Sequence, residues 1–260
     1  MPLPLSVAIV CRDNVGTIGA AVDSVRDLAA EIVALDNGST DGTIELLESR
    51  GVRVERTQWL GHIRTKQRAL EACRQPWILS IDSDESVRPD LAESIRRAFA
   101  GGEPGEPALA VRRVVYYRAR PLKHAWQPEW RTRLVRAGSA RWAGRDPHDV
   151  LTPVDPSVRP RRLDGVLRHD SISTFIEFLH KQVQYGRISA DELHAAGKRS
   201  GPFRLVVSPC GAFLKQLVVK RSFLDGWPGW LAASSACIAS AAKHVALIEL
   251  GRTNGRDSEP

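Results

Sequence analysis

The first hundred residues alternate short apolar runs with amphipathic stretches, and this alternation allows few folds. The apolar runs predict buried strands at 5–11, 32–35, 52–54 and 77–81. Apolar side chains at helical spacing follow each run, so a helix is expected after every strand. This order predicts an α/β fold in which a mostly parallel sheet is flanked by helices. Ligands bind to such sheets beyond the carboxyl ends of the strands.

The pattern changes after residue 100. A loop rich in glycine and proline occupies residues 100–107 and ends the alternation. From about residue 173 the apolar spacing becomes helical and remains so almost to the C-terminus. We therefore expect an α/β domain over residues 1–170 and a helical C-terminal extension over residues 171–260.

The charge of the chain is positive and unevenly distributed. Lys and Arg number 37 against 30 Asp and Glu, which gives a net charge of +7. Residues 112–145 hold nine Arg and one Lys but a single acid, Glu129. Such a segment favours a partner that carries phosphates, namely a nucleic acid, an anionic lipid or a phosphorylated substrate. A solvated basic surface is the simpler alternative.

The cysteines and the apolar stretches bear on the cellular compartment. Four cysteines without a CxxC pair argue against a zinc site and a disulfide framework. The N-terminus lacks the features of a signal peptide, so we expect a cytoplasmic protein. No window reaches the roughly 18–20 apolar residues that span a bilayer; residues 226–242 come closest and are interpreted as a buried or interfacial helix. Residues 203–221 predict either a basic amphipathic helix on an anionic membrane or an ordinary core helix.

Acidic residues follow three of the predicted strands. Asp13 follows the first strand, Asp36 ends the second, and Asp82, Asp84 and Glu85 end the fourth. The sequence contains no GxGxxG turn and no GxxxxGK[ST] loop that would cradle a phosphate with backbone amides. A carboxylate-lined site holds a diphosphate when a cation lies between them, and Mg²⁺ and Mn²⁺ prefer such oxygen ligands. The sequence therefore predicts a metal–diphosphate site, the alternative being an acidic cluster at the start of the next helix.

Several motifs in order resemble the family 2 glycosyltransferases, which have the GT-A fold. The strongest similarity lies in residues 6–10, 34–43 and 77–85. Later segments are similar to the lipopolysaccharide-core β-glucosyltransferase-like subgroup, at residues 131–136, 144–149, 167–171 and 223–226. The resemblance implies an inverting, metal-dependent enzyme. It would move a sugar from a nucleotide diphosphate donor, with UDP favoured, to a hydroxyl of a cell-envelope glycan or lipid-linked acceptor.

The resemblance also implies roles for particular residues. Asp13, Asp36, Lys66 and Asp82 would line the nucleotide site, and Asp82 and Asp84 would bind Mn²⁺ or Mg²⁺. Residues 1–170 would then carry the donor site and catalysis. The helical extension would serve the acceptor side or the membrane, which implies a cytoplasmic enzyme lying peripherally on the inner face of the cytoplasmic membrane.

Inversion by direct displacement requires a general base that takes the proton of the acceptor hydroxyl. The resemblance gives Asp149 this role, with Glu129 as the second candidate. A structural ion pair with the surrounding arginines is the alternative for either residue. The resemblance also implies that His148 and His169 lie near the diphosphate or the metal. The alternative for each is a hydrogen-bonded histidine with a structural role only.

Three other functions compete with this interpretation. A glycosyltransferase-like protein could bind the donor without catalysis. A nucleic-acid-binding module could use the basic segment 112–145, but the acidic strand ends would repel a phosphate backbone, so no nucleic acid is expected as a partner. A phosphatase with Asp82 as nucleophile is disfavoured, because such enzymes place the motif after their first strand.

Overall fold

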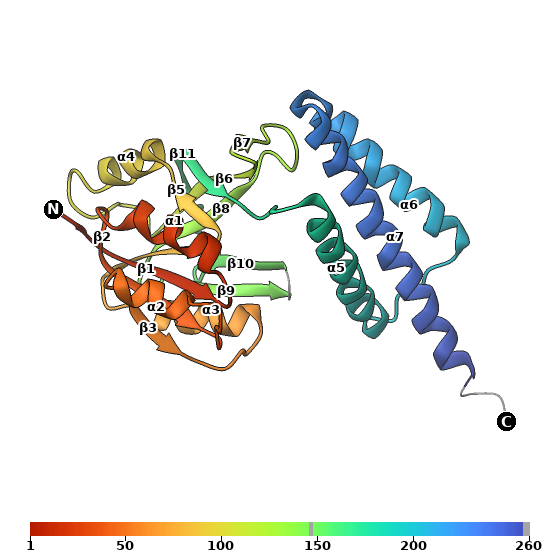
Figure 1. Cartoon of the computed structure of the whole chain (residues 1–260), viewed down its shortest axis with the longest axis horizontal. Coiled ribbons are helices and arrows are strands. Elements are labelled where there is room, and N and C mark those ends of the chain that lie inside the picture. The colour runs from red at the N-terminus through yellow and green to blue at the C-terminus, as the bar shows by residue number, and fades with distance from the viewer. Residues whose placement is uncertain (146–147, 257–260) are drawn as a thin grey trace. The chain divides into compact units, whose positions relative to one another are not determined.

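The computed structural model describes residues 1–145 and 148–256, which form two compact units (Figure 1). The α/β unit combines residues 1–114 with 129–170, and the helical unit combines residues 115–128 with the chain from Ser171 onward. The sequence analysis placed residues 115–128 with the α/β domain. Their contacts place them with the helices, because Leu122 and Ala125 are buried against Phe175.

The α/β unit is built on a curled sheet with the strand order β3–β2–β1–β4–β8–β6–β11–β5. Two further strands, β9 and β10, form an antiparallel ribbon. The strands are β1 (Leu3–Cys11), β2 (Ala29–Asp36), β3 (Arg53–Arg56), β4 (Trp77–Asp82), β5 (Glu85–Val87), β6 (Ala108–Tyr117), β8 (Trp130–Arg136), β9 (Ala140–Arg145), β10 (His148–Pro153) and β11 (Arg161–His169). The helices are α1 (Val15–Val25), α2 (Thr43–Ser49), α3 (His62–Glu71) and α4 (Pro89–Ala98). The expected α/β fold with flanking helices is confirmed.

Parallel pairing is confined to the first four strands. β1 pairs with β2 on one side and with β4 on the other, and β2 pairs with β3. Cys11 thereby lies opposite Asp36, and Val10 lies opposite Asp82, so three strand ends meet at one edge. Antiparallel pairs join β8 to β4 and to β6, and β5 to β11. The sheet is therefore mixed rather than mostly parallel.

Both faces of β1 are buried, which explains its nearly continuous apolar sequence. Val7 and Ile9 pack in a core with Ile18 of α1 and Leu91 of α4. Ala8 points to the opposite face and packs in a second core with Leu70 of α3. Successive side chains of a strand alternate between faces, so one strand supplies both cores and holds the strand-end edge between the helical layers.

The sheet curls between β4 and β5. Only Ser83 and Asp84 separate these two strands, yet β5 pairs with β11 at the far end of the strand order. Residues 82–85 therefore connect β4, in the middle of the strand order, to β5 at one end of the curled sheet. The acidic motif at the end of β4 lies in this connection.

The helical unit contains three long helices. Its elements are β7 (Arg120–Pro121), α5 (Phe175–Ala195), α6 (Pro202–Leu214), the π-helical turn η1 (Lys215–Val219), the 3-10 turn η2 (Ser222–Asp225) and α7 (Trp227–Arg256). Thr174 caps α5 by accepting a hydrogen bond from the backbone amide of Glu177 at 3.2 Å. Gly186 lets α5 approach α7 closely, because a Cβ there would lie 2.8 Å from the carbonyl oxygen of Ala239.

Asp225 ties two distant segments of the helical unit together. Its carboxylate accepts hydrogen bonds from the backbone amides of Lys123, His124 and Ala125 at 2.8–2.9 Å. The ring of His124 lies 2.9 Å from the same carboxylate. The side chain of Asp225 is almost fully buried, so this residue fixes the 122–125 segment against the turn before α7.

Two stretches of the helical unit are long and apolar enough, by length and composition, to cross a membrane. The first is Pro202–Val219, of which 17% is buried, and the second is Trp227–Arg252, of which 33% is buried. This finding corrects the expectation that no such window exists. Alanine and serine in α7 lower its hydropathy without adding charge, so the stretch remains apolar enough to meet this length and composition.

Gly165 on β11 provides a test of the packing beneath α4. It has a φ of +94°, and a Cβ at this position would lie 2.4 Å from the backbone nitrogen of Leu91. We expect Gly165→Ala to destabilise the protein by about 3 kcal/mol, because both the backbone conformation and the contact become strained. Thermal denaturation should show a fall in Tm of roughly 6–12 °C.

Gly101→Ala is the matched control for this substitution. A Cβ at Gly101 meets nothing within 4 Å, so its Tm should change by less than about 2 °C. A Gly165→Ala protein as stable as the wild type would show that α4 moves freely away from β11.

Candidate active site

The edge where the parallel strands end holds two groups of acidic residues. The first group, Asp13 and Asp36, forms hydrogen bonds with the loop that follows β2. Asp36 ends β2 fully buried and accepts hydrogen bonds from the backbone amides of Gly38 at 2.8 Å and Ser39 at 2.9 Å, and from the Ser39 hydroxyl. Asp13 accepts a hydrogen bond from the amide of Thr40 at 2.8 Å and remains exposed. Contact of either residue with a nucleotide stays a prediction, and Asp13 is the more accessible of the two.

The nearby thiol of Cys11 is not poised for chemistry. Burial first, and then the charge of Asp36, raise the pKa of this thiol to about 12. All four cysteines are free, in keeping with the absence of a CxxC pair in the sequence.

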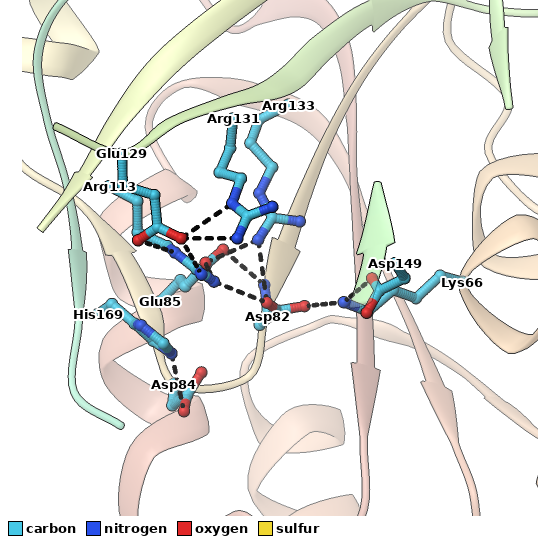
Figure 2. Close-up of polar contacts among 10 residues, drawn as sticks. All are labelled: Lys66, Asp82, Asp84, Glu85, Arg113, Glu129, Arg131, Arg133, Asp149 and His169. Carbon is cyan, nitrogen blue, oxygen red and sulfur yellow. Dashed lines mark hydrogen bonds and ion pairs between the residues drawn. The ribbon is translucent and has the colours of Figure 1, made fainter. Parts of the chain in front are cut away.

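The second group begins with Lys66, which lies between two carboxylates (Figure 2). Its ammonium group is 2.7 Å from Asp82 Oδ1 and 2.8 Å from Asp149 Oδ2. Burial opposes the positive charge, but the two carboxylates outweigh this effect and raise the pKa of Lys66. Lys66 therefore stays charged and joins the end of β4 to β10.

The packing of α3 explains why Lys66 points into the site. Residues three and four positions apart share a helix face, so Lys66 lies on the same face as the buried Ala69 and Leu70. Its ammonium group also lies 4.7 Å from the centroid of the Trp142 ring, a favourable cation–π distance. The backbone amide of Trp142 donates a 3.0 Å hydrogen bond to Gln67, which fixes β9 beside α3.

Arg133 on β8 balances the charge of Asp82 and Glu85. Its guanidinium is 3.0 Å from Asp82 Oδ2 and 2.7 Å from Glu85 Oε1. Glu85 is fully buried, and its other oxygen accepts a hydrogen bond from the amide of Asp82 at 3.0 Å. Burial opposes ionisation of Asp82, but Lys66 and Arg133 hold the pKa of its carboxyl well below the usual value.

Arg113 on β6 extends the network to Glu129. Arg113 donates to both oxygens of Glu129, at 2.6 and 3.1 Å, and contacts Glu85 at 3.1 Å. Arg131 adds a further contact to Glu129 at 2.7 Å. Burial raises the pKa of Glu129, but the two arginines outweigh it, so the pKa is lowered. A carboxylate held in this way is a weak proton acceptor.

Asp84 stands apart from this network and contacts His169 of β11. Asp84 Oδ2 lies 3.4 Å from His169 Nε2. Burial raises the pKa of the Asp84 carboxyl, but the imidazole outweighs it and lowers the pKa. Asp84 and His169 thus bring one carboxylate and one imidazole to the connection between β4 and β5.

This pair fits a cation that takes its other ligands from substrate and water. Among the side chains that the structure describes, which exclude that of His148, no three of Asp, Glu, His or Cys converge on a point where they alone could hold a metal. Mg²⁺ and Mn²⁺ sites in nucleotide enzymes are typically built from one or two carboxylates together with phosphate oxygens and water. Asp82 offers less to a cation, because both its oxygens already contact Lys66 and Arg133.

The structure brings most of the predicted site residues together. Lys66 contacts both Asp82 and Asp149, and Asp84 contacts His169. Glu129 is linked to Asp82 through Arg113. Asp13 and Asp36 instead bond to the loop that follows β2. His148 lies in β10, and its side chain falls outside what the structure describes.

Sequence reasoning missed the roles of Arg113, Arg131, Arg133 and Glu85. The composition of the arginine-rich segment favours phosphates on a partner, whereas four of its arginines pair with carboxylates of the chain itself. A usable signal was present, because Arg131 and Arg133 are two residues apart on a strand and share one face. Their partners follow from the register of β6 and β8, which the sequence does not show.

Strand ends that carry carboxylates, on a sheet covered by helices, are typical of α/β proteins that bind a ligand at that edge. The sequence model of the family "Glycosyl transferase family 2" matches residues 6–149, which is more than half of the chain. The chain therefore belongs to glycosyltransferase family 2, as its motifs predicted, and is an enzyme of the transferase class.

Curated relatives support this assignment over most of the chain. An uncharacterised glycosyltransferase of Rickettsia prowazekii is 27% identical over 87% of this chain and 80% of its own length. The lipopolysaccharide core biosynthesis glycosyltransferase LpsC of Rhizobium meliloti is 29% identical over 91% of this chain and 88% of its own length.

Solved structures match over shorter stretches. TarS of S. aureus is 17% identical with a TM-score of 0.39, over 53% of this chain and 28% of its own. Glucosyl-3-phosphoglycerate synthase of Mycobacterium tuberculosis, crystallised with Mn²⁺ and UDP, is 24% identical with a TM-score of 0.36. That match covers 43% of this chain, which spans less than half of the synthase.

Glu129 gives the network a testable pH dependence. Its pKa lies below the ordinary value of 4.5 in the folded protein, so its stabilising contribution is complete above that pH. The contribution is lost as the pH falls through the lowered pKa of the folded state. We expect Glu129→Gln to cost about 2 kcal/mol at pH 7 and to flatten the fall in stability below pH 4.5. Urea denaturation between pH 3 and pH 7 measures both effects.

Glu106→Gln is the control for the Glu129 substitution. Glu106 pairs with Arg161 at 2.9 Å, but both side chains are more than 40% exposed. The loss of stability should stay within the error of the measurement, because solvent screens an exposed ion pair. Equal effects of the two substitutions would contradict a central role for Glu129.

Proposed function

We propose that this enzyme transfers a sugar from a nucleoside diphosphate donor, with UDP favoured, to a hydroxyl of a cell-envelope glycan or lipid-linked acceptor. Membership of family 2 and the similarity to LpsC support this class of reaction. The observation that carries the proposal is the placement of Asp149 beside Asp82 through Lys66. It puts a candidate base next to the edge where the donor would bind.

Asp84 and His169 are the residues we assign to a divalent cation, Mn²⁺ or Mg²⁺. When bound, such a cation neutralises the charge that develops on the departing diphosphate. Asp82 retains its predicted place beside the nucleotide, where Lys66 and Arg133 would hold its carboxylate in one orientation. Lys66 adds a fixed positive charge near the anionic donor.

Asp149 is a better base than Glu129 on geometric grounds. The described contacts of Asp149 involve one carboxylate oxygen, which binds Lys66. Both oxygens of Glu129 are bound by Arg113, and one also by Arg131. A general base needs an oxygen that reaches the acceptor hydroxyl. We therefore assign proton removal to Asp149 and a positioning role to Glu129. A single base is consistent with inversion in one displacement.

The two units suggest a division of labour, which we also propose. The α/β unit would hold the donor site, and the helical unit would serve the acceptor side or the membrane. A nucleotide-sugar donor and a lipid-linked acceptor together favour a location on the cytoplasmic side of the membrane.

Donor and metal binding can be tested by thermal stability. UDP at 100 times its dissociation constant, with Mn²⁺, adds about 2.7 kcal/mol and should raise the Tm by roughly 5–10 °C. We expect the Mn²⁺-dependent part of this rise to vanish with EDTA and in Asp84→Asn. GDP, ADP and CDP run in parallel identify the base.

The exposed Asp23, which pairs with Arg50 on the surface, supplies the control Asp23→Asn for the thermal measurement. It should leave the shift unchanged. If no nucleotide raises the Tm while DNA or RNA binds tightly and in a salt-sensitive manner, the proposal of a nucleotide-donor site is contradicted.

Asp149→Asn tests the base. We expect kcat for UDP release from the UDP-sugar to fall about 10²–10⁴-fold, with the thermal shift caused by UDP and Mn²⁺ retained. Glu129→Gln, assayed at pH 7, should lower kcat at least about tenfold less than Asp149→Asn does, because it removes a positioning contact and not the base. Donor binding by the wild type without any turnover would instead favour a non-catalytic binding protein. If Glu129→Gln abolishes activity while Asp149→Asn does not, Glu129 is the base and Asp149 the positioning residue.

A further inference from the structure

The helical unit exposes a continuous series of apolar side chains. Phe203 is 78% exposed, Val206 64%, Leu214 55% and Val219 73%. The series continues beyond η1 with Phe223 and Leu224 of η2 and with Trp227 at the start of α7. Side chains of this kind are usually buried. So many exposed apolar side chains within one segment favour an interaction surface.

The exposed side chains lie on one face of the helix. Phe203, Val206, Val207 and Leu214 are spaced at three, four and eleven residues, which repeats the helical period. Other positions of the same helical segment are buried, as Leu217 shows. The helix therefore contributes some side chains to the core of the unit and keeps a second apolar face in water.

The charge around this face is almost entirely positive. Residues 193–248 contain seven Lys and Arg and one acid, Asp225. The carboxylate of Asp225 is buried and bound by three backbone amides. Arg204 and Lys215 are exposed beside the apolar side chains. The surface thus combines apolar side chains with uncompensated positive charge.

We propose that the face formed by residues 203–227 docks on the surface of an anionic lipid bilayer. Apolar side chains would enter the boundary between headgroups and acyl chains, while Arg204 and Lys215 would meet anionic headgroups. Trp227 and Trp230, both about half exposed, are residue types enriched at this boundary. A second copy of the chain is a poorer occupant, because it would present the same positive charge.

The charges also argue for lying on the bilayer rather than crossing it. Lys243 lies within the apolar stretch Trp227–Arg252, and Lys215 lies within Pro202–Val219. Ionised side chains inside the hydrocarbon core are costly and rare. The inference accords with the proposed lipid-linked acceptor, but it is measured without donor or acceptor, so the two can fail separately.

Vesicle flotation of the full chain tests the proposal. Vesicles of phosphatidylcholine with 30% phosphatidylglycerol are compared with phosphatidylcholine alone. We expect binding to the anionic vesicles that weakens at 0.5 M NaCl. The triple variant Phe203→Ser, Val219→Ser, Phe223→Ser should bind at least tenfold more weakly. The double variant Arg204→Gln, Lys215→Gln should lose roughly fivefold for each charge removed.

Matched controls come from α5 of the same unit. Ile176→Ser removes an equally exposed apolar side chain, and Lys181→Gln with Arg187→Gln removes two exposed charges. Both should float as the wild type does. All variants should melt cooperatively with a Tm within a few degrees of the wild-type value, measured without any ligand, which shows that they are folded.

Three results would overturn the proposal. One is failure of the wild type to float with any vesicle. Another is binding that is independent of lipid charge and of salt concentration and that persists after carbonate extraction. Such binding would indicate helices that cross the bilayer. The third is a concentration-dependent dimer that the triple variant abolishes, which would show that a second copy covers the face.

Discussion

The α/β unit depends on the compensation of one buried charge, the carboxylate of Glu85. This side chain has no exposed surface, and a lone carboxylate in such a place would cost several kcal/mol. Arg133 and Arg113 balance it, and each comes from a different strand. The ion pairs therefore join β5, β6 and β8. They hold the sheet in its curl, and the curl brings the connection after β4 to the strand-end edge.

The same network leaves the site nearly neutral before any ligand binds. Four cations, Lys66, Arg113, Arg131 and Arg133, face four carboxylates, Asp82, Glu85, Glu129 and Asp149 (Figure 2). Asp84 stands outside this balance, and its described ion pair is with an imidazole. The arrangement separates carboxylates that fix the geometry from one that is available to a cation. Under the proposed function, the donor would meet side chains that are already oriented, which lowers the cost of reorganisation.

The sequence predicted the alternation of strands and helices and the edge where the acids gather, because both follow from local patterns. It also predicted the family, which the comparisons confirm. It did not predict which acids would be occupied by cations. The partners of Asp82 and Glu85 come from strands about fifty and thirty residues away, and their pairing depends on antiparallel register and on the curl. Asp36 shows the same limit, since its position followed from the motif but its bonds to Gly38 and Ser39 depend on the loop conformation.

The bond between Asp225 and residues 123–125 has a consequence for biosynthesis. Ala125 and Asp225 are separated by 100 residues, so the helical unit is discontinuous along the chain. During translation the 122–125 segment emerges from the ribosome long before its acceptor exists. At about 5–20 residues per second this delay is roughly 5–20 s. Vectorial folding of the helical unit therefore cannot finish until nearly the whole polypeptide has been made, and a nascent chain stalled before residue 225 would keep those amides in water.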